Sequence, residues 1–122
     1  MVGNACATGG HITCSDERFK EEIRAIEDPV ARIERLRGVE FQWRQAEFAE
    51  YQFRSGRQVG FIAQEVQEVL PEVVSRGADG YLAMDYSRVT PLLVEAIKEQ
   101  QQRIEELEAL VEKLAEQVTA TQ

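Results

Sequence analysis

The sequence predicts an α+β protein: a small globular module of short helices and a few strands, followed by a long C-terminal helix that forms a parallel trimeric coiled coil. Short apolar segments with alternating or helical spacing, separated by turn residues, occupy positions 15–86. A seven-residue apolar repeat then runs through positions 87–122. A chain of 122 residues has room for one domain, or two at most.

Charge limits the partners that the chain can bind. Fourteen Lys and Arg residues against twenty-two Asp and Glu residues leave a formal charge of −8, which repels phosphate backbones and anionic membranes. No apolar run approaches the ~20 residues that cross a bilayer, and the N-terminus lacks a signal-peptide pattern. We therefore expect no nucleic acid and no membrane as a partner.

Residues 1–14 are small and β-branched, with a Gly-Gly pair and no helical period. They predict an extended leader that continues something upstream. Cys6 and Cys14 are expected as reduced thiols, because two cysteines in so short a loop do not make a disulfide scaffold. With His11 they offer three zinc ligands where structural zinc normally takes four, so we expect no metal and no cofactor.

Local signals predict the first elements of the module. Residues 15–26 open with a serine in N-cap position and acids in the first turn, which predicts a short helix. Asp28-Pro29 starts a second helix, which Gly38 ends. Apolar and polar residues then alternate over positions 39–43, as in a half-buried strand.

The rest of the module follows in short pieces. Residues 45–58 are polar and aromatic and predict a protruding loop or hairpin, whose aromatic side chains need a covering partner. Residues 64–70 predict a short amphipathic helix that Pro71 stops. Two strand arms, around positions 73–74 and 81–86, flank a turn.

The last helix carries the most regular pattern. Its heptad a positions are Ile97, Ile104, Val111 and Val118, and its d positions are Leu93, Gln100, Leu107 and Leu114. A helix of ~30 residues is ~45 Å long and would overhang so small a body, which favours self-association over packing on its own domain. Such a and d residues form dimers in the simplest cases, but Leu110 and Ala115 widen the apolar face and Gln100 adds a register-fixing polar layer, so we predict three strands.

One pair of side chains, Ser15 and Lys20, suggests covalent chemistry. A serine attacks a carbonyl when a base takes its proton, and a lysine can be that base if burial lowers its pKa. The two residues are ~140° out of phase on an ideal helix, so they meet only if the chain turns or the lysine stem folds back. On spacing alone, the favoured alternative is an N-cap role for Ser15 and a solvated charge for Lys20.

Five segments in a fixed order extend this pattern: Ser15–Ile23, Gly38–Trp43, Gly60–Val66, Asp85–Val89 and Ala96–Gln100. Together they resemble the peptidase S74 family, the C-terminal intramolecular chaperone domain of phage tailspikes and tail fibres, including endosialidases. The resemblance covers roughly residues 13–110. It implies a homotrimer that assists folding and trimerisation of an upstream β-helical fibre in the same polypeptide and then releases itself by autoproteolysis with a Ser-Lys dyad.

The resemblance also divides the chain. Residues 1–14 would be the end of the fibre, residues 15–86 the chaperone and autoprotease module, and residues 87–122 the coiled-coil trimerisation helix. Residues 45–58 would be a short form of the family's protrusion, which embraces the upstream chains. The expected location is the host cytoplasm during virion assembly, within a tail fibre precursor, with release from the mature virion fibre after cleavage.

In the family pattern, Ser15 matches the nucleophile and Lys20 the base of a self-cleaving, single-turnover serine endopeptidase. Attack of Ser15 Oγ on the Cys14 carbonyl passes through a five-membered ring, whereas attack on its own carbonyl needs a strained four-membered ring. Cleavage at Cys14-Ser15 is therefore favoured over Ser15-Asp16, and the resemblance leaves both bonds open. The alternative function is a trimerisation or capping module that does not cleave.

Overall fold

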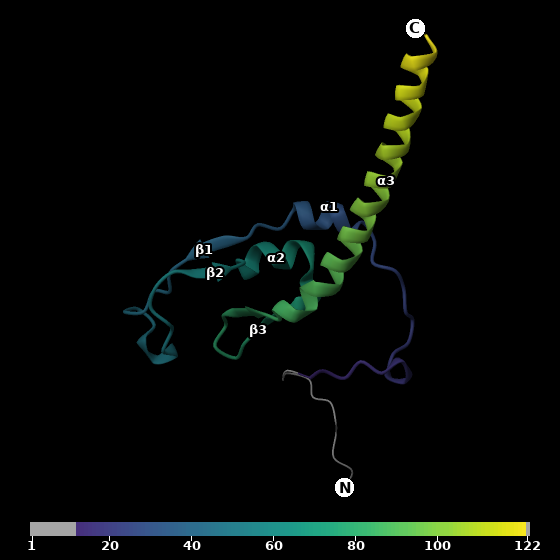
Figure 1. The fold of residues 1–122 in the computed structure, drawn as a ribbon. Helices are drawn as coiled ribbons and strands as arrows, with labels where there is room; N and C mark the ends of the chain where they lie inside the picture. Colours follow the sequence, from purple (N-terminus) through teal and green to yellow (C-terminus); the bar gives the residue numbers. More distant parts are fainter. Residues whose placement is uncertain (1–11, 122) are drawn as a thin grey trace.

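The computed structural model describes residues 12–121 and confirms the α+β class. Short helices and strands precede one long helix (Figure 1). In chain order the elements are the 3₁₀ turn Glu17–Phe19, α1 (Pro29–Glu34), β1 (Val39–Phe41), the 3₁₀ turn Ala49–Tyr51, β2 (Gln58–Gly60), α2 (Ala63–Val69), the 3₁₀ turn Pro71–Val73, β3 (Val74–Arg76), β4 (Leu82–Met84), the 3₁₀ turn Tyr86–Val89 and α3 (Thr90–Ala120).

The strands form two antiparallel hairpins. In the first, β1 pairs with β2 so that Val39 lies opposite Gly60. In the second, β3 pairs with β4 so that Val74 lies opposite Met84. The half-buried strand expected from the alternating residues is confirmed, although its pairing ends at Phe41. Most of the connection between β1 and β2 is the segment 45–58, which lies at the far end of this hairpin (Figure 1).

The core lies where α2, the following 3₁₀ turn and the start of α3 meet. Its buried members are Val66, Leu70, Val73, Val89 and Leu92. Partly buried side chains from α1, from Phe61 just after β2 and from the second hairpin pack around them, and α1 lies against α3. Burying one such aliphatic side chain stabilises a fold by roughly 1.5–3 kcal/mol, so this small cluster stabilises the module.

Of the three helices predicted within the module, the second and third form, although α1 ends at Glu34, before Gly38 is reached. Pro29 occupies the first turn of α1, where its missing amide proton costs nothing. α2 ends before Pro71, whose ring cannot continue an α-helix. The helix predicted over residues 15–26 is wrong, because this segment contains only a three-residue 3₁₀ turn. Phe19 and Ile23 are exposed there, and a short helix without a packed apolar face is marginal in water.

Helix α3 leaves the body after its first turns. Leu92 and Ala96 are buried, whereas every residue from Gln100 to Thr121 is exposed. Its 31 residues extend about 46 Å, and the helix projects away from the module (Figure 1). Within residues 12–121, no helix combines the length and apolar character that crossing a membrane requires.

Candidate active site on the N-terminal arm

Residues 12–24 form an arm that runs outward from the body (Figure 1). Within the described chain, no hydrogen bond or ion pair joins residues 15–24 to the rest of the module. The arm returns to the body at Ile26, which packs against the core. Asp28 then adopts a left-handed backbone conformation, with φ of 49°, and redirects the chain into α1.

The 3₁₀ turn brings the two predicted reactive side chains together. Lys20 Nζ donates a hydrogen bond to Ser15 Oγ at 2.8 Å. The turn is closed by two backbone hydrogen bonds of 3.0 Å, from Phe19 N to Asp16 O and from Lys20 N to Glu17 O. A tight turn between the two residues thus brings their side chains into contact, which an ideal helix or strand would not do.

Asp16, rather than Ser15, caps this turn, so the N-cap interpretation of Ser15 is wrong. Asp16 Oδ1 accepts hydrogen bonds from the Arg18 backbone amide at 2.9 Å and from Arg18 Nε at 3.1 Å, while Oδ2 accepts from Arg18 Nη2 at 2.9 Å. These bonds lower the pKa of the Asp16 carboxyl and raise that of the Arg18 guanidinium. The Ser15 hydroxyl is therefore not needed as a cap.

The solvent environment of the pair also bears on its chemistry. Ser15 and Lys20 are both exposed in the single chain. So are the apolar side chains of Ile12, Phe19 and Ile23, with about two-thirds or more of their surface open. Burial is the usual way in which a protein turns a lysine into a base, and in the single chain both side chains remain in contact with water.

Cys14, on the other side of Ser15, is half-buried and disulfide-bonded. The expectation of a reduced thiol at this position is therefore wrong. The other two of the three possible zinc ligands, Cys6 and His11, lie outside the described residues. Within residues 12–121, no group of three or more His, Cys, Asp or Glu side chains is arranged to hold a metal ion.

The predicted seam runs along the exposed side of α3, from its first turns to its free end. Its side chains are Leu93, Ile97, Gln100, Ile104, Leu107, Val111, Leu114 and Val118. The seven apolar members are 44–64% exposed, and Gln100 is exposed as well. Leu110, at 54% exposure, widens the same stripe. A single chain leaves this whole apolar stripe in water.

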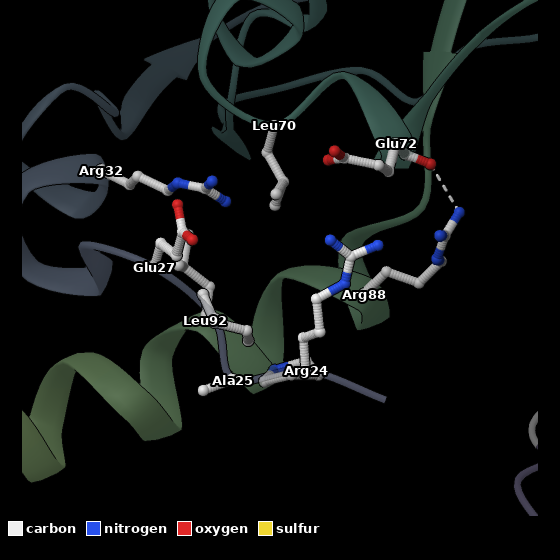
Figure 2. A pocket seen from close by; sticks show the side chains of 10 residues that line it. Arg24, Ala25, Glu27, Arg32, Leu70, Glu72, Arg88 and Leu92 are labelled. Carbon is white, nitrogen blue, oxygen red and sulfur yellow. Dashed lines mark hydrogen bonds between the residues drawn. The ribbon is translucent and has the colours of Figure 1, made fainter. Parts of the chain in front are cut away.

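A pocket of about 470 Å³ lies where residues 24–27 pass the first turns of α3 (Figure 2). Arg24, Arg32 and Arg88 line it together with two glutamates and with apolar side chains that include Leu70 and Leu92. Arg88 Nη1 donates a 2.6 Å hydrogen bond to the Glu72 backbone oxygen. Sequence reasoning missed this pocket, because its arginines are scattered along the chain and share no spacing.

An aromatic cluster connects the two hairpins, and its details were not predicted. Trp43 stacks on Phe53 with ring centroids 4.3 Å apart, and Phe53 stacks on Tyr51 at 5.3 Å. Tyr51 Oη donates a 2.8 Å hydrogen bond to Asp79 Oδ2, in the turn between β3 and β4. Tyr81 packs edge-on against this group. The second hairpin is thus a partner for aromatic side chains of segment 45–58.

The chain belongs to the peptidase S74 family, because residues 15–75, half of its length, match the family described as "Chaperone of endosialidase". The resemblance drawn from the sequence is therefore confirmed. The match begins at Ser15 and takes in the arm, α1, the first hairpin and α2. The chain thus carries a domain of a peptidase family.

Among known proteins, the chain is similar to long tail fiber proteins Gp37. It is 33% identical over 99 residues to those of Enterobacteria phages K3 and T2, covering 78% of this chain and 8% and 7% of theirs. It is 30% identical over 115 residues to that of Salmonella phage S16, covering 87% of this chain and 15% of that protein. The matched region is thus a small part of each relative.

Proposed function

We propose that this chain is an intramolecular chaperone that trimerises, assists the folding of an upstream β-helical tail fibre in the same polypeptide, and then releases itself by cleavage next to Ser15. The observation that carries the proposal is the 2.8 Å hydrogen bond between Lys20 Nζ and Ser15 Oγ. It lies at the start of the family match. Similarity to tail fiber proteins supports an upstream fibre as the partner.

The proposed reaction uses only Ser15, Lys20 and water, once per chain. Neutral Lys20 takes the proton of Ser15 Oγ, which attacks the carbonyl carbon of Cys14 through a five-membered ring. The carbon–nitrogen bond breaks, the protonated Lys20 returns its proton to the Ser15 amine, and an ester joins Cys14 to Ser15 Oγ. Water then hydrolyses the ester, which leaves a carboxylate on Cys14 and restores the hydroxyl.

Trimerisation is supported by the exposed stripe of α3. Three parallel copies would bury the seven apolar seam side chains against one another, which removes their surface from water. They would also hold three upstream chains in register at the same height. We place this step in the host cytoplasm during virion assembly, with the module leaving the mature virion fibre after cleavage.

The second candidate function is a trimerisation or capping module that does not cleave. The observation that favours it is the exposure of both Ser15 and Lys20 in the single chain, because an exposed lysine lacks the desolvation that activates a base. Both candidates share the trimer. They differ only in whether a shorter fragment appears.

Mass spectrometry of the fibre polypeptide that carries this module, before and after assembly, tests the proposal. We expect the wild type to release a fragment that begins at residue 15, or at residue 16 if the Ser15-Asp16 bond is cut. Ser15→Ala and Lys20→Met should stay intact, whereas the control Ser55→Ala, at another exposed serine, should cleave. A wild type as intact as Ser15→Ala would refute the protease and leave the capping module.

A further inference from the structure

We propose that the Asp16–Arg18 pair positions the Ser15–Lys20 dyad, by holding the turn that joins the reactive groups and by keeping the Asp16 carboxylate from pairing with Lys20. This inference rests on the proposed cleavage function and deepens it. Neither Asp16 nor Arg18 takes part in the bond changes. Both act through the geometry and the charge around the lysine.

The geometric part follows from the hydrogen bonds of Asp16. Its Oδ1 atom accepts from the Arg18 backbone amide at 2.9 Å, which forms the side-chain-capped turn that aspartate favours. The same turn brings the start of the Lys20 side chain back toward Ser15, so that the amine reaches the hydroxyl. Without regular structure in the arm, this cap is the local device that fixes the separation of the two groups.

The electrostatic part follows from the side chain of Arg18. Its guanidinium holds both carboxylate oxygens of Asp16, at 3.1 and 2.9 Å, in the two-pronged geometry that makes such pairs strong. The lowered pKa of Asp16 arises first from the Arg18 side chain, then from the Arg18 amide, and only after these from the charge of Lys20. Asp16 therefore lies within electrostatic reach of Lys20 but is bound by Arg18.

A carboxylate that pairs directly with a lysine stabilises the ammonium form, which cannot accept a proton. By holding Asp16, Arg18 removes this competitor from the base. The other charged groups of the arm are Glu17, Glu21, Glu22 and Arg24. Of these, Glu22 and Arg24 lie 4.0 Å apart, and within the described residues none forms an ion pair with Lys20.

The test is the pH dependence of fragment release from the full fibre polypeptide carrying Arg18→Gln. Without Arg18, the Asp16 carboxylate should pair with Lys20 and stabilise its ammonium form. The rise of the release rate with pH, which follows loss of a proton from the base, should then occur at higher pH. A shift of one pH unit slows release about tenfold below this rise and leaves the rate above it unchanged. Arg18→Lys replaces the planar guanidinium with a compact ammonium group, so its pH profile should lie between those of the wild type and Arg18→Gln.

The double variant Asp16→Asn/Arg18→Gln distinguishes the electrostatic effect of Asp16 on Lys20 from its effect on the geometry of the turn. Asn retains the oxygen that caps the turn but has no charge, so the profile should return toward that of the wild type. Arg24→Gln, on the same arm but without a close hydrogen-bonded acid, is the matched control and should leave the profile unchanged. All variants should keep the oligomeric state of the wild type, because the arm is exposed.

Two outcomes would overturn the inference. One is an Arg18→Gln profile that coincides with that of the wild type. The other is an equal loss of rate at every pH that the double variant does not restore, which would indicate a purely structural effect. A wild type that releases no fragment at any pH refutes the proposed cleavage itself, and is thereby distinguished from both.

Discussion

Tyr86 Oη accepts a hydrogen bond from the Phe61 backbone amide at 2.9 Å, and the two aromatic rings stack 5.7 Å apart. This contact joins the end of the first hairpin to the 3₁₀ turn that leads into α3. Gly60, which is buried, lies beside the same hydroxyl, and a Cβ atom at this position would overlap the hydroxyl oxygen. An alanine at this position would force the Tyr86 side chain to move, so the close approach of β2 to Tyr86 favours glycine.

Gly60→Ala should lower the free energy of unfolding of the module by about 1–3 kcal/mol, the usual cost of inserting a methyl group into a packed site. Urea unfolding followed by circular dichroism measures it. Gly38→Ala is the control, because a Cβ atom there meets nothing within 4 Å and the backbone is not left-handed. Equal free energies of unfolding for the two variants would contradict the close contact between Gly60 and the Tyr86 hydroxyl.

Leu92→Ala should destabilise the module by about 2–5 kcal/mol, since the side chain is 1% exposed and its loss leaves a cavity. Val59→Ala, at a residue that is 79% exposed on the first hairpin, should change the free energy of unfolding by less than about 0.5 kcal/mol. Thermal unfolding at a fixed protein concentration compares them. Similar melting temperatures would show that the core lies elsewhere.

Leu107→Asp should dissociate the proposed trimer, because it places three unpaired charges in one layer of the seam. Ala109→Asp introduces the same charge at heptad position f, on the outer face, and should leave the trimer intact. Sedimentation equilibrium of the purified chains distinguishes three copies from one. A trimer in both variants would refute the assigned heptad, and a monomeric wild type would refute the trimer.

Gln100→Leu should raise the melting temperature of the trimer, because it replaces the one polar layer among the predicted d positions with an apolar one. It should also relax the register, so that species other than three-stranded ones appear by sedimentation. A lower melting temperature would mean that the amide stabilises its layer. In that case, Gln100 makes hydrogen bonds across the seam.

The hydrogen bond from Tyr51 to Asp79 raises the pKa of the phenol to about 12, from an ordinary value of 10.0. A raised pKa means that folding favours the neutral phenol. Its contribution to stability is therefore complete below pH 10, and is lost as the pH rises from about 10 to about 12. The stabilisation that the Tyr51–Asp79 hydrogen bond gives to the contact between the two hairpins should therefore be lost between about pH 10 and about pH 12.

Ultraviolet absorbance of tyrosinate follows this titration, and the difference between the wild type and Tyr51→Phe isolates the phenol. We expect a midpoint of about 12, falling toward 10.0 in Asp79→Asn, where the carboxylate is gone. A midpoint near 10.0 in the wild type would show that the hydrogen bond does not form in solution.

The sequence patterns identified elements that depend on local signals. Helix α2 has an amphipathic run stopped by Pro71, and α3, which is 31 residues long, has a seven-residue repeat from Leu93 to Val118. The arm could not be predicted in the same way. The acids after Ser15 are also the signal that opens an α-helix, and what decides the conformation is the lack of a packing surface for Phe19 and Ile23.

The sequence named Ser15 and Lys20 as a pair that could meet only if the chain turned between them. The structure contains that turn and the contact, while the role of the pair stays a prediction. The cap that makes the turn belongs to Asp16, and its hydrogen bonds to Arg18 were not foreseen. Contacts between distant segments, such as Tyr51 with Asp79, depend on how the two hairpins meet and leave no periodic trace in the sequence.

Ser15 and Lys20 lie at the two ends of a single turn, and neither belongs to the core. We therefore expect loss of the hydroxyl or of the amine to leave the scaffold unaltered. Under the proposed chemistry, one codon change at position 15 or 20 would turn a self-releasing chain into a permanent cap, and the reverse change would restore release. Under that chemistry, a single substitution would be enough for a phage lineage to change between fibres that keep this module and fibres that release it.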